Sequence, residues 1–512
     1  MKIDKRHLLN YSILIPYLVL SILGLIVVYS TSSATLVQVG ANSLRSVLNQ
    51  GVFWIVSLLA IALIYKIKLD FLKDNRLIII VIFVEILLLI FSRVLGARIN
   101  GAHGWLRFGP ISLQPAEYLK IILVWFLALR FSHQQDEISI YDYQALTRNQ
   151  VIPRALNDWR IIVLLLIGIV AALPDLGNAT ILLLTAMIMV TVSGIGYRWF
   201  STLLGVLVTL STVVLTSIWL IGVEKVAKVP VFGYVAKRFS AFFNPFKDVS
   251  GAGHQLANSY YAMSNGGWFG LGLGNSIEKR GYLPEAQTDF VFSIVIEEFG
   301  FIGASLILAL LFFLILRIIL VGIRAKDPFN SMMALGVGGM LLTQTFVNIG
   351  GISGLIPSTG VTFPFLSQGG NSLLVLSVAI AFVLNIDANE KRESLVYLEQ
   401  DSGVRITILP HAHLESPNFS LHFNPDGFAP SSYERIVDAE EKDAVDKGYD
   451  TNWHTAEVQQ SGTNRWQKVA SDKNDKVKKE TKIPEKMPTQ TVAWLSNLFA
   501  PKPQANLTGA LN

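Results

Sequence analysis

The chain has 512 residues, of which 52% are hydrophobic and 15% are charged, and its net charge is +5. A soluble globular domain carries about 25% charged residues, so the composition argues against a soluble fold for the chain as a whole. There is no cysteine. This excludes a disulfide framework, a thiolate metal site, a cysteine nucleophile and a C-terminal prenyl anchor.

The charged residues are concentrated at the end of the chain. Residues 391–512 hold 15 Lys and Arg and 17 Asp and Glu. The first 390 residues instead contain repeated apolar runs of roughly 18 to 23 residues, each long enough to cross a bilayer core of ~30 Å. The two parts are therefore expected to have different surroundings, a membrane for the first and water for the second.

The apolar runs predict an all-α polytopic membrane protein with about ten transmembrane helices, because open sheet edges are not tolerated in lipid. The first run follows a charged start but is too long for a signal-peptide core, so we interpret it as a retained span. The predicted spans lie at residues 11–32, 51–69, 76–94, 115–132, 160–174, 177–193, 199–221, 290–322, 331–350 and 367–387.

The distribution of Lys and Arg between short loops predicts the orientation, since these residues accumulate in cytoplasmic loops. With the N-terminus inside, the inner loops carry more Lys and Arg than the short outer loops: Lys66, Lys68, Lys73, Arg76, Arg148, Arg154, Arg160, Arg198, Arg324 and Lys326. Both termini are then cytoplasmic, and the long loop at about residues 222–289, between the seventh and eighth spans, faces outward. The polar segment 391–512 is predicted to be a largely disordered cytoplasmic tail.

Ionisable residues inside or at the edge of a span are functional candidates. Glu117 and Lys120 are three residues apart on one helical face near its outer end, so they can pair. They are either a structural ion pair or part of a functional site. Asp175 lies on an outer turn, and it either caps the following helix or contributes to chemistry.

Asp289 leads from the long outer loop into the eighth span. Asp289, Ser293 and Glu297 share one face if the helix is continuous. Counting about 20 residues outward from Arg317 places Glu297 at the outer membrane boundary. Asp289 would then lie about 12 Å higher, at the level of lipid headgroups. The alternative is that Thr288 or Asp289 only caps the helix.

Several cations accompany Asp289 in the outer loop, among them Arg238, Lys279 and Arg280. Such groups can bind a diphosphate, or they can bind anionic lipid headgroups. The glycine-rich run at residues 270–274 lacks dinucleotide-binding spacing and predicts a flexible or close-packed loop.

Several motifs, read in order along about residues 8–390, resemble those of the SEDS (shape, elongation, division and sporulation) family of peptidoglycan glycosyltransferases. The N-terminal part and residues 265–289 resemble its division-type branch more than its elongation-type branch. Gln368 departs from the family pattern, in which a tyrosine is usual. The motifs are GWLR at 104–107, QPAE at 114–117, PDLG at 174–177, LPEAQTDF at 283–290, GLIPSTG at 354–360 and FPFLSQGG at 363–370.

The resemblance implies an enzyme that polymerises lipid II, a disaccharide-pentapeptide on undecaprenyl pyrophosphate, at the outer face of the cell membrane and at the division septum. It also implies a class B penicillin-binding protein and other divisome membrane proteins as partners. The protein is also expected to contact the lipid bilayer, and it is not expected to bind nucleic acid.

The resemblance also implies roles for individual residues. Asp289 is the expected general base, although it could instead bind a divalent cation such as Mg²⁺ or Mn²⁺. Two other functions stay open: a lipid II flippase, and a non-catalytic scaffold that recruits the penicillin-binding protein. The expected substrate-binding residues are Arg238, Lys279, Arg280, Trp105, Glu117, Lys120 and Glu297.

Overall fold

The computed structural model describes residues 5–99, 102–108, 111–135, 137–138, 158–222, 225, 233–251 and 253–402. Residues 1–408 form one compact unit. The predicted tail lies outside the described residues from residue 403 onward. Its first part is described, however, and it continues the last helix to Ser402, where Leu395 packs with Leu8 and Ala388.

Each of the ten predicted spans forms a helix. Their bounds are α1 (Tyr11–Gln38), α2 (Arg45–Lys66), α3 (Asn75–Leu95), α4 (Pro115–Ser132), α7 (Trp159–Ala172), α8 (Leu176–Val192), α9 (Tyr197–Ile221), α13 (Val291–Arg324), α14 (Pro328–Ile352) and α15 (Gly370–Ser402).

Not all ten helices have the same membrane-spanning character. Among the described residues, seven helices are long and apolar enough to cross a bilayer, namely α1, α2, α3, α9, α13, α14 and α15. Helices α7 and α8 are apolar but shorter, with 14 and 17 residues. Helix α4 has 18 residues and carries Glu117, Lys120 and Arg130.

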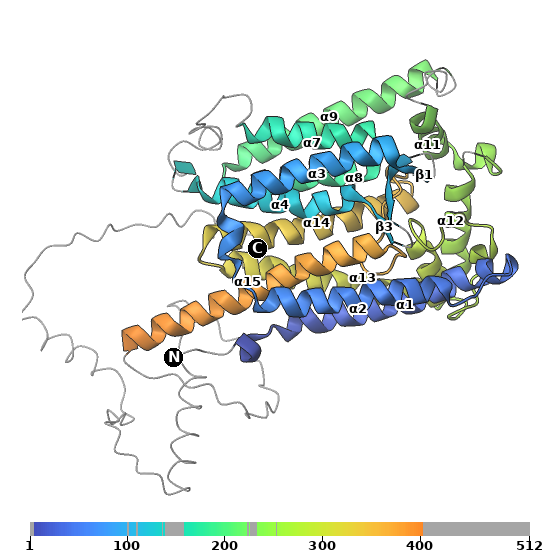
Figure 1. The fold of residues 1–512 in the computed structure, drawn as a ribbon. Helices are drawn as coiled ribbons and strands as arrows, with labels where there is room; N and C mark the ends of the chain where they lie inside the picture. The colour runs from blue at the N-terminus through green and yellow to red at the C-terminus, as the bar shows by residue number, and fades with distance from the viewer. Residues whose placement is uncertain are drawn as a thin grey trace, which may run out of the picture. The chain divides into compact units, whose positions relative to one another are not determined.

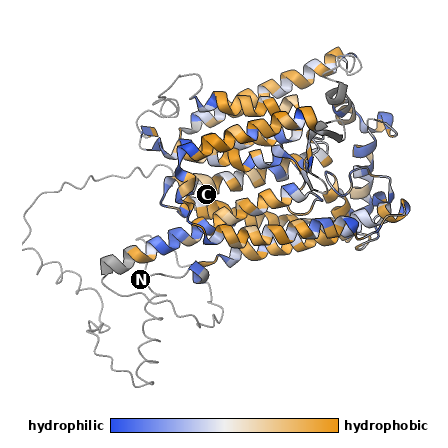
Figure 2. Cartoon of the chain, in the orientation of Figure 1, coloured by the Kyte–Doolittle hydropathy of each residue, from blue (hydrophilic) through white to orange (hydrophobic). Residues whose placement is uncertain are grey.

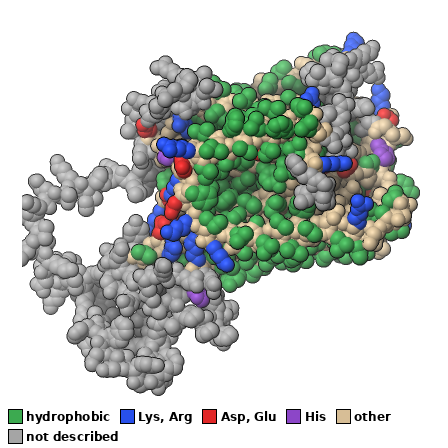
Figure 3. Space-filling view, in the orientation of Figure 1, with side chains coloured by type: hydrophobic (Ala, Val, Ile, Leu, Met, Phe, Trp, Pro, Cys, Tyr) green, Lys and Arg blue, Asp and Glu red, His purple; other side chains and the backbone are tan. Residues whose placement is uncertain are grey.

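The helices run side by side (Figure 1), and α14 packs against α4, α8, α13 and α15. Helices α14 and α15 are buried along most of their length, whereas the apolar stretch of α9 is exposed. The middle of the bundle is hydrophobic, and polar residues gather towards its two ends (Figure 2). The side chains visible in Figure 3 follow the same pattern, with charged groups on either side of an apolar belt. This is the distribution that a bilayer requires.

The described parts of the long loop lie at one end of the bundle, and the start of α1 and the end of α15 lie at the other (Figure 1). The loop contains α11 (Gly233–Phe243), α12 (His254–Gly266) and the short 3₁₀ helices η4 (Pro245–Asp248) and η5 (Glu278–Arg280). Two further 3₁₀ helices are η1 (Lys5–Leu8) and η2 (Leu69–Lys73).

A small antiparallel sheet between α3 and α4 was not predicted by the sequence analysis. Strands β1 (Ala97–Ile99), β2 (Ala102–Phe108) and β3 (Ile111–Leu113) are ordered β1-β2-β3. Ala97 pairs with Trp105, and Arg107 pairs with Ser112. The short apolar and aromatic alternation of this loop is long enough for a hairpin but not for a span, so the fold is mostly helical rather than entirely so.

Helix α13 is broken at Gly300, whose φ of 72° and ψ of 177° suit glycine only. The chain around this break pairs with the glycine-rich loop. The amides of Leu271 and Gly272 donate to the carbonyls of Glu297 and Glu298, both at 2.9 Å. The amide of Phe301 donates to the carbonyl of Gly267, also at 2.9 Å.

Close approach of these two backbones requires glycine. A Cβ at Gly270 would lie 2.2 Å from the carbonyl oxygen of Glu298, and one at Gly266 would lie 2.1 Å from that of Ile296. The loop is therefore of the close-packed kind. The break also corrects the predicted depth of Asp289, because a constant rise of about 1.5 Å per residue from Arg317 does not hold across it.

Candidate functional site

Asp289 lies on a turn that enters α13, and its carboxylate does not cap that helix. The N-cap residue is Phe290, and no side chain accepts a capping hydrogen bond there. In the preceding turn, the amides of Thr288 and Phe290 both donate to the carbonyl of Glu285, which has a positive φ of 56°. The simple capping interpretation of Asp289 therefore fails, and its carboxylate is free for another role.

Side chains and backbone from two distant segments hold this turn. Asn348 on α14 donates to the carbonyl of Asp289 at 2.7 Å. The hydroxyl of Ser367 donates to the carbonyl of Thr288 at 2.6 Å, and the amide of Gln368 donates to that of Gln287 at 2.8 Å. The turn is fixed by its backbone, which leaves the side chain of Asp289 to face a cavity.

The cavity has a volume of about 200 Å³ and is lined mainly by polar residues. Four of the residues predicted to form the site meet there: Asp289, Arg238, Trp105 and Glu117. Asp175 lines it as well. The other lining residues are Gln114, Pro174, Asn178, Glu285, Thr288, Thr359, Gly360, Thr362, Gln368, Gly369, Asn371 and Ser372.

Arg238 is the only Lys or Arg among the described residues that line this cavity. Its guanidinium donates to the carbonyl of Ser358. A Cβ at Gly360, whose φ is 76°, would lie 3.1 Å from Nη2 of Arg238 and 3.3 Å from Oδ2 of Asp289. The absence of a side chain at Gly360 therefore lets the cation and the carboxylate approach the same point.

Burial raises the pKa of Asp289 from its usual 3.8 to about 7. The carboxylates of Glu285 and Asp175 also raise this pKa, whereas Arg238 and a hydrogen bond from Thr288 lower it. A carboxyl with a pKa near the working pH is suited to take up a proton during a reaction.

Asp175 caps α8, as one of the two interpretations predicted. Its carboxylate accepts from the amide of Asn178 at 3.1 Å and from the Asn178 side chain at 2.9 Å. Gln114 also donates to it at 3.3 Å. Burial raises the pKa of Asp175 above its ordinary value. Because Asp175 also lines the cavity, capping and a contribution to the site's electrostatics coexist.

Glu117 and Lys120 form the predicted ion pair. The ammonium of Lys120 lies 2.7 Å from Oε2 of Glu117, and both side chains are almost completely buried. Lys120 also donates to Gln344 at 3.1 Å. Glu117 faces the cavity, and Lys120 compensates its charge from behind.

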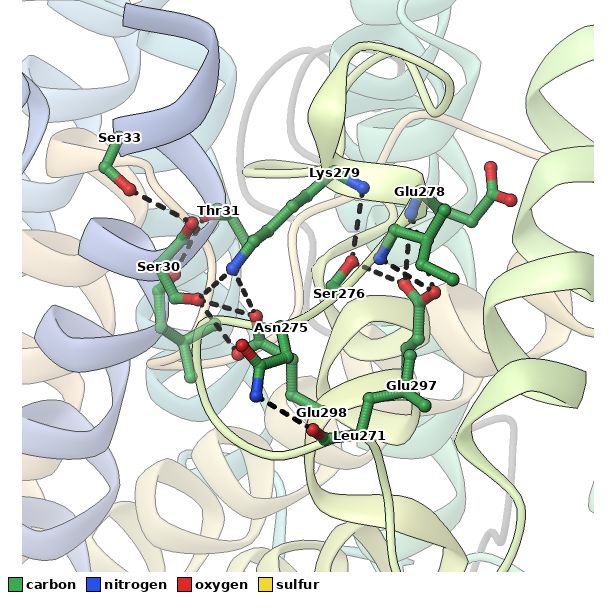
Figure 4. A network of polar contacts seen from close by, with 12 residues as sticks. Ser30, Thr31, Ser33, Leu271, Asn275, Ser276, Glu278, Lys279, Glu297 and Glu298 are labelled. Carbon is green, nitrogen blue, oxygen red and sulfur yellow. Dashed lines mark hydrogen bonds and ion pairs between the residues drawn. The ribbon is translucent and has the colours of Figure 1, made fainter. Parts of the chain in front are cut away.

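Two other predicted substrate-binding residues, Lys279 and Glu297, do not line the cavity. They belong to a separate network of polar contacts (Figure 4). Lys279 points toward Ser30 and Glu298, and its ammonium lies 2.6 Å from Oε1 of Glu298. Glu297 accepts hydrogen bonds from Ser276, from the amide of Ile277 and from Asn265. Both charged groups organise the long loop around the break in α13.

Arg280 does not line the cavity either. Its carbonyl accepts from Gln38, at the end of α1, at 3.3 Å. The shared positive charge of Arg280 and Arg238 predicted a common site, but only Arg238 lines the cavity. The structure therefore brings Arg238 to Asp289, and it does not bring Lys279, Arg280 or Glu297 there.

Sequence reasoning missed several residues of the site. Glu285, Gln368 and Asn371 line the cavity, and Asn348 holds the turn. Glu285 lies four residues before Asp289, and its place in the same motif was the available signal. Gln368 and Asn371 are uncharged, so a search for ionisable groups passes over them.

The described residues include no group of three or more acidic or histidine side chains that could form a metal cage. Mg²⁺ is usually bound by one or two carboxylates together with substrate phosphates, and Asp289 and Glu285 could supply those carboxylates. A divalent cation at this cavity stays a prediction.

Residues 11–392 match the FtsW, RodA and SpoVE family, which is described as "Cell cycle protein". A Lactococcus lactis protein named "Probable peptidoglycan glycosyltransferase FtsW" is 48% identical over 77% of this chain and 96% of its own length. An Enterococcus hirae protein of the same name is 36% identical, with the same coverage of each chain.

Two solved structures have a similar fold. One, described as "Structural coordination of polymerization and crosslinking by a peptidoglycan synthase complex", has a TM-score of 0.57 and 25% identity. It covers 75% of this chain and 98% of that chain. The other is the rod shape determining protein RodA of Thermus thermophilus, with a TM-score of 0.51 and 24% identity, covering 75% and 97% of the two chains.

Proposed function

Since this chain belongs to the FtsW, RodA and SpoVE family of cell cycle proteins, we propose that it is a peptidoglycan glycosyltransferase that polymerises lipid II. The names of its relatives support this activity and the division-type branch. One observation supports this mechanism most directly. The carboxyl of Asp289, whose pKa burial raises to about 7, faces a polar cavity that Arg238 also lines.

In the proposed reaction, the 4-hydroxyl oxygen of the acceptor sugar attacks the anomeric carbon of the donor sugar. The new C–O bond forms as the bond from that carbon to the pyrophosphate breaks. Asp289 takes the proton of the hydroxyl, and the bonding electron pair leaves with undecaprenyl pyrophosphate. A single displacement of this kind inverts the anomeric centre.

The residues around Asp289 would stabilise the leaving group and bind the sugars. Arg238 supplies positive charge where the leaving pyrophosphate becomes more negative. Trp105 offers an aromatic surface at the cavity, and Glu117, paired with Lys120 behind it, offers an acceptor for sugar hydroxyls. If Asp289 instead binds a divalent cation, with Glu285 as the second carboxylate, that cation would supply the positive charge that stabilises the leaving pyrophosphate.

A chain of the peptidoglycan synthase complex described above, in which polymerisation and crosslinking are coordinated, has a similar fold. We therefore propose that a class B penicillin-binding protein is the partner, together with other divisome membrane proteins at the septum. The long loop would face outward and both termini would be cytoplasmic. A reporter fused after Ser402 should be cytoplasmic, and one inserted near Gly251 should be external; finding both on one side would refute this orientation.

Polymerisation of purified lipid II by the purified protein tests the function. The protein is reconstituted in vesicles, alone and with its penicillin-binding partner, and glycan products are separated by gel. Product formation is expected at least in the presence of the partner. Lipid II translocation without polymerisation would instead support a flippase, and partner recruitment without either activity would support a scaffold.

A further inference from the structure

Asn348 joins two segments of the site through one side-chain amide. It lies on α14 near the outer end of that helix and is 3% exposed. Its Nδ2 donates to the carbonyl of Asp289 at 2.7 Å and to the carbonyl of Val361 at 2.6 Å. An amide nitrogen has two hydrogens, so both are used in backbone contacts.

The two carbonyls belong to the two functional parts of the cavity. One is the carbonyl of the residue whose side chain is the proposed base. The other follows Gly360 directly, in the loop whose Ser358 carbonyl binds Arg238. The gap left by Gly360 is where Arg238 and Asp289 come close to one point. Asn348 therefore connects the backbone that carries the base to the backbone that binds the cation.

We propose that Asn348 is a positioning residue, which sets the place of Asp289 relative to Arg238 by tying their two backbone segments together. The proposal rests on the proposed glycosyltransferase function. Asn348 itself contacts no substrate in this arrangement. Its effect on the reaction passes through Asp289 and Arg238.

A general structural role is the main rival, because any buried amide that pairs two carbonyls stabilises a fold. Leaving such carbonyls unpaired costs about 1–3 kcal/mol each. The chain provides a matched control in Asn385 on α15, which is completely buried. Its Nδ2 also donates to two carbonyls, those of Ile64 and Ile67 at the end of α2. Its Nδ2 therefore makes the same pair of donations away from the cavity, and its Oδ1 also accepts from Lys5 and Asn389.

The pH dependence of the reaction distinguishes the two roles. The charged groups that act on Asp289 are Glu285 and Asp175, which raise its pKa, and Arg238, which lowers it. If the tie is lost and Arg238 moves away, the lowering effect weakens. The rise of the polymerisation rate with pH then moves to higher pH.

The experiment measures lipid II polymerisation by partner-bound protein in vesicles from pH 5 to 9, for wild type, Asn348→Leu, Asn385→Leu and Asp289→Asn. A 1 Å misplacement at an active site costs about 100-fold, so Asn348→Leu should lower kcat by about 10- to 100-fold with KM little changed. The midpoint of its pH profile should move upward. Asn385→Leu should reduce thermal stability and leave the midpoint in place.

An unshifted midpoint for Asn348→Leu, or equal shifts for both variants, would overturn the positioning role. If Asn348→Leu does not fold, Asn348→Ser, which keeps one hydrogen-bond donor, is measured in the same way. An unshifted pH midpoint for that variant would likewise overturn the positioning role. The Asp289→Asn arm separates this proposal from the function itself. An inactive Asp289→Asn with an unshifted Asn348 variant rejects only the positioning role, whereas a fully active Asp289→Asn rejects the assigned base.

Discussion

The ammonium of Lys279 lies 2.6 Å from the carboxylate of Glu298, and their side chains are only 4% and 1% exposed. The hydroxyl of Ser30 on α1 donates to the same carboxylate at 2.6 Å. This contact links the long loop between α9 and α13, the segment of α13 before its break, and α1. The charge of Lys279 is therefore compensated within the protein by Glu298.

Removing one member of this buried pair should destabilise the protein. Lys279→Met leaves Glu298 without its counter-ion, at a cost of about 3–5 kcal/mol. The double variant Lys279→Met/Glu298→Leu removes both charges and should recover much of that loss. Thermal unfolding in detergent measures both. Folded Lys279→Met that keeps full stability but loses polymerisation would instead support a direct pyrophosphate contact.

The pair of Glu117 and Lys120 calls for a parallel experiment with a different expectation. Glu117→Ala leaves the ammonium of Lys120 buried with Gln344 as its remaining partner. Its folded yield should therefore be lower than that of Glu117→Ala/Lys120→Ala. Because Glu117 also faces the cavity, the double variant should polymerise lipid II more slowly than the Lys279/Glu298 double variant does. Equal polymerisation rates for the two double variants would show that Glu117 does not contribute to the reaction.

The comparison of these two pairs shows how far the sequence could predict the site. Spacing of three residues along a helix fixes the geometry of Glu117 and Lys120, so their contact followed from local structure. Lys279 and Glu298 are brought together by the glycine-rich loop and by the break at Gly300. No local pattern contains that information.

The same distinction applies to the fold. Apolar runs predicted the ten helices that form the bundle of described residues, but not α11 or α12, because a membrane span needs a long apolar segment. The sheet of β1, β2 and β3 and the continuation of α15 to Ser402 are set by contacts with neighbouring elements, such as Leu395 against Leu8. Asn348 is uncharged, so a search for ionisable groups passes over it, and its bonds to Asp289 and Val361 depend on three segments meeting in space.

The pH dependence of polymerisation should reflect Asp289. A base acts in its deprotonated form, so the rate should rise through about pH 7 and level off above it. Glu285 raises the pKa of Asp289 because its own negative charge disfavours a second one nearby. Glu285→Gln should therefore move the rise to lower pH, as measured by kcat/KM for lipid II. A rise that stays in place would show that Asp289 is not the titrating group or that Glu285 does not act on it.

Asp289→Asn separates chemistry from structure at the centre of the site. Asparagine keeps the shape of the side chain, and the backbone contacts of the turn to Asn348 and Gln368 do not involve the carboxylate. Folding, membrane insertion and partner binding should therefore be normal.

The stability of this variant gives an independent check. Because the pKa of Asp289 is raised from 3.8 to about 7, its contribution to stability is fully present below pH 3.8 and is lost as the pH rises through 7. A neutral asparagine does not lose it, so the melting temperature of Asp289→Asn should exceed that of wild type more at pH 8 than at pH 5.

Polymerisation by Asp289→Asn should fall by at least the ~100-fold typical of losing a general base, while lipid II binding survives. Binding is measured with labelled lipid II in vesicles, and polymerisation by gel with the partner present. Asp289→Glu is the matched control, since it retains a carboxylate and should keep more activity than the asparagine variant. If Asp289→Asn polymerises at nearly the wild-type rate, the proton must be taken by another carboxylate of the same cavity, and Asp175, Glu117 and Glu285 become the groups to replace next.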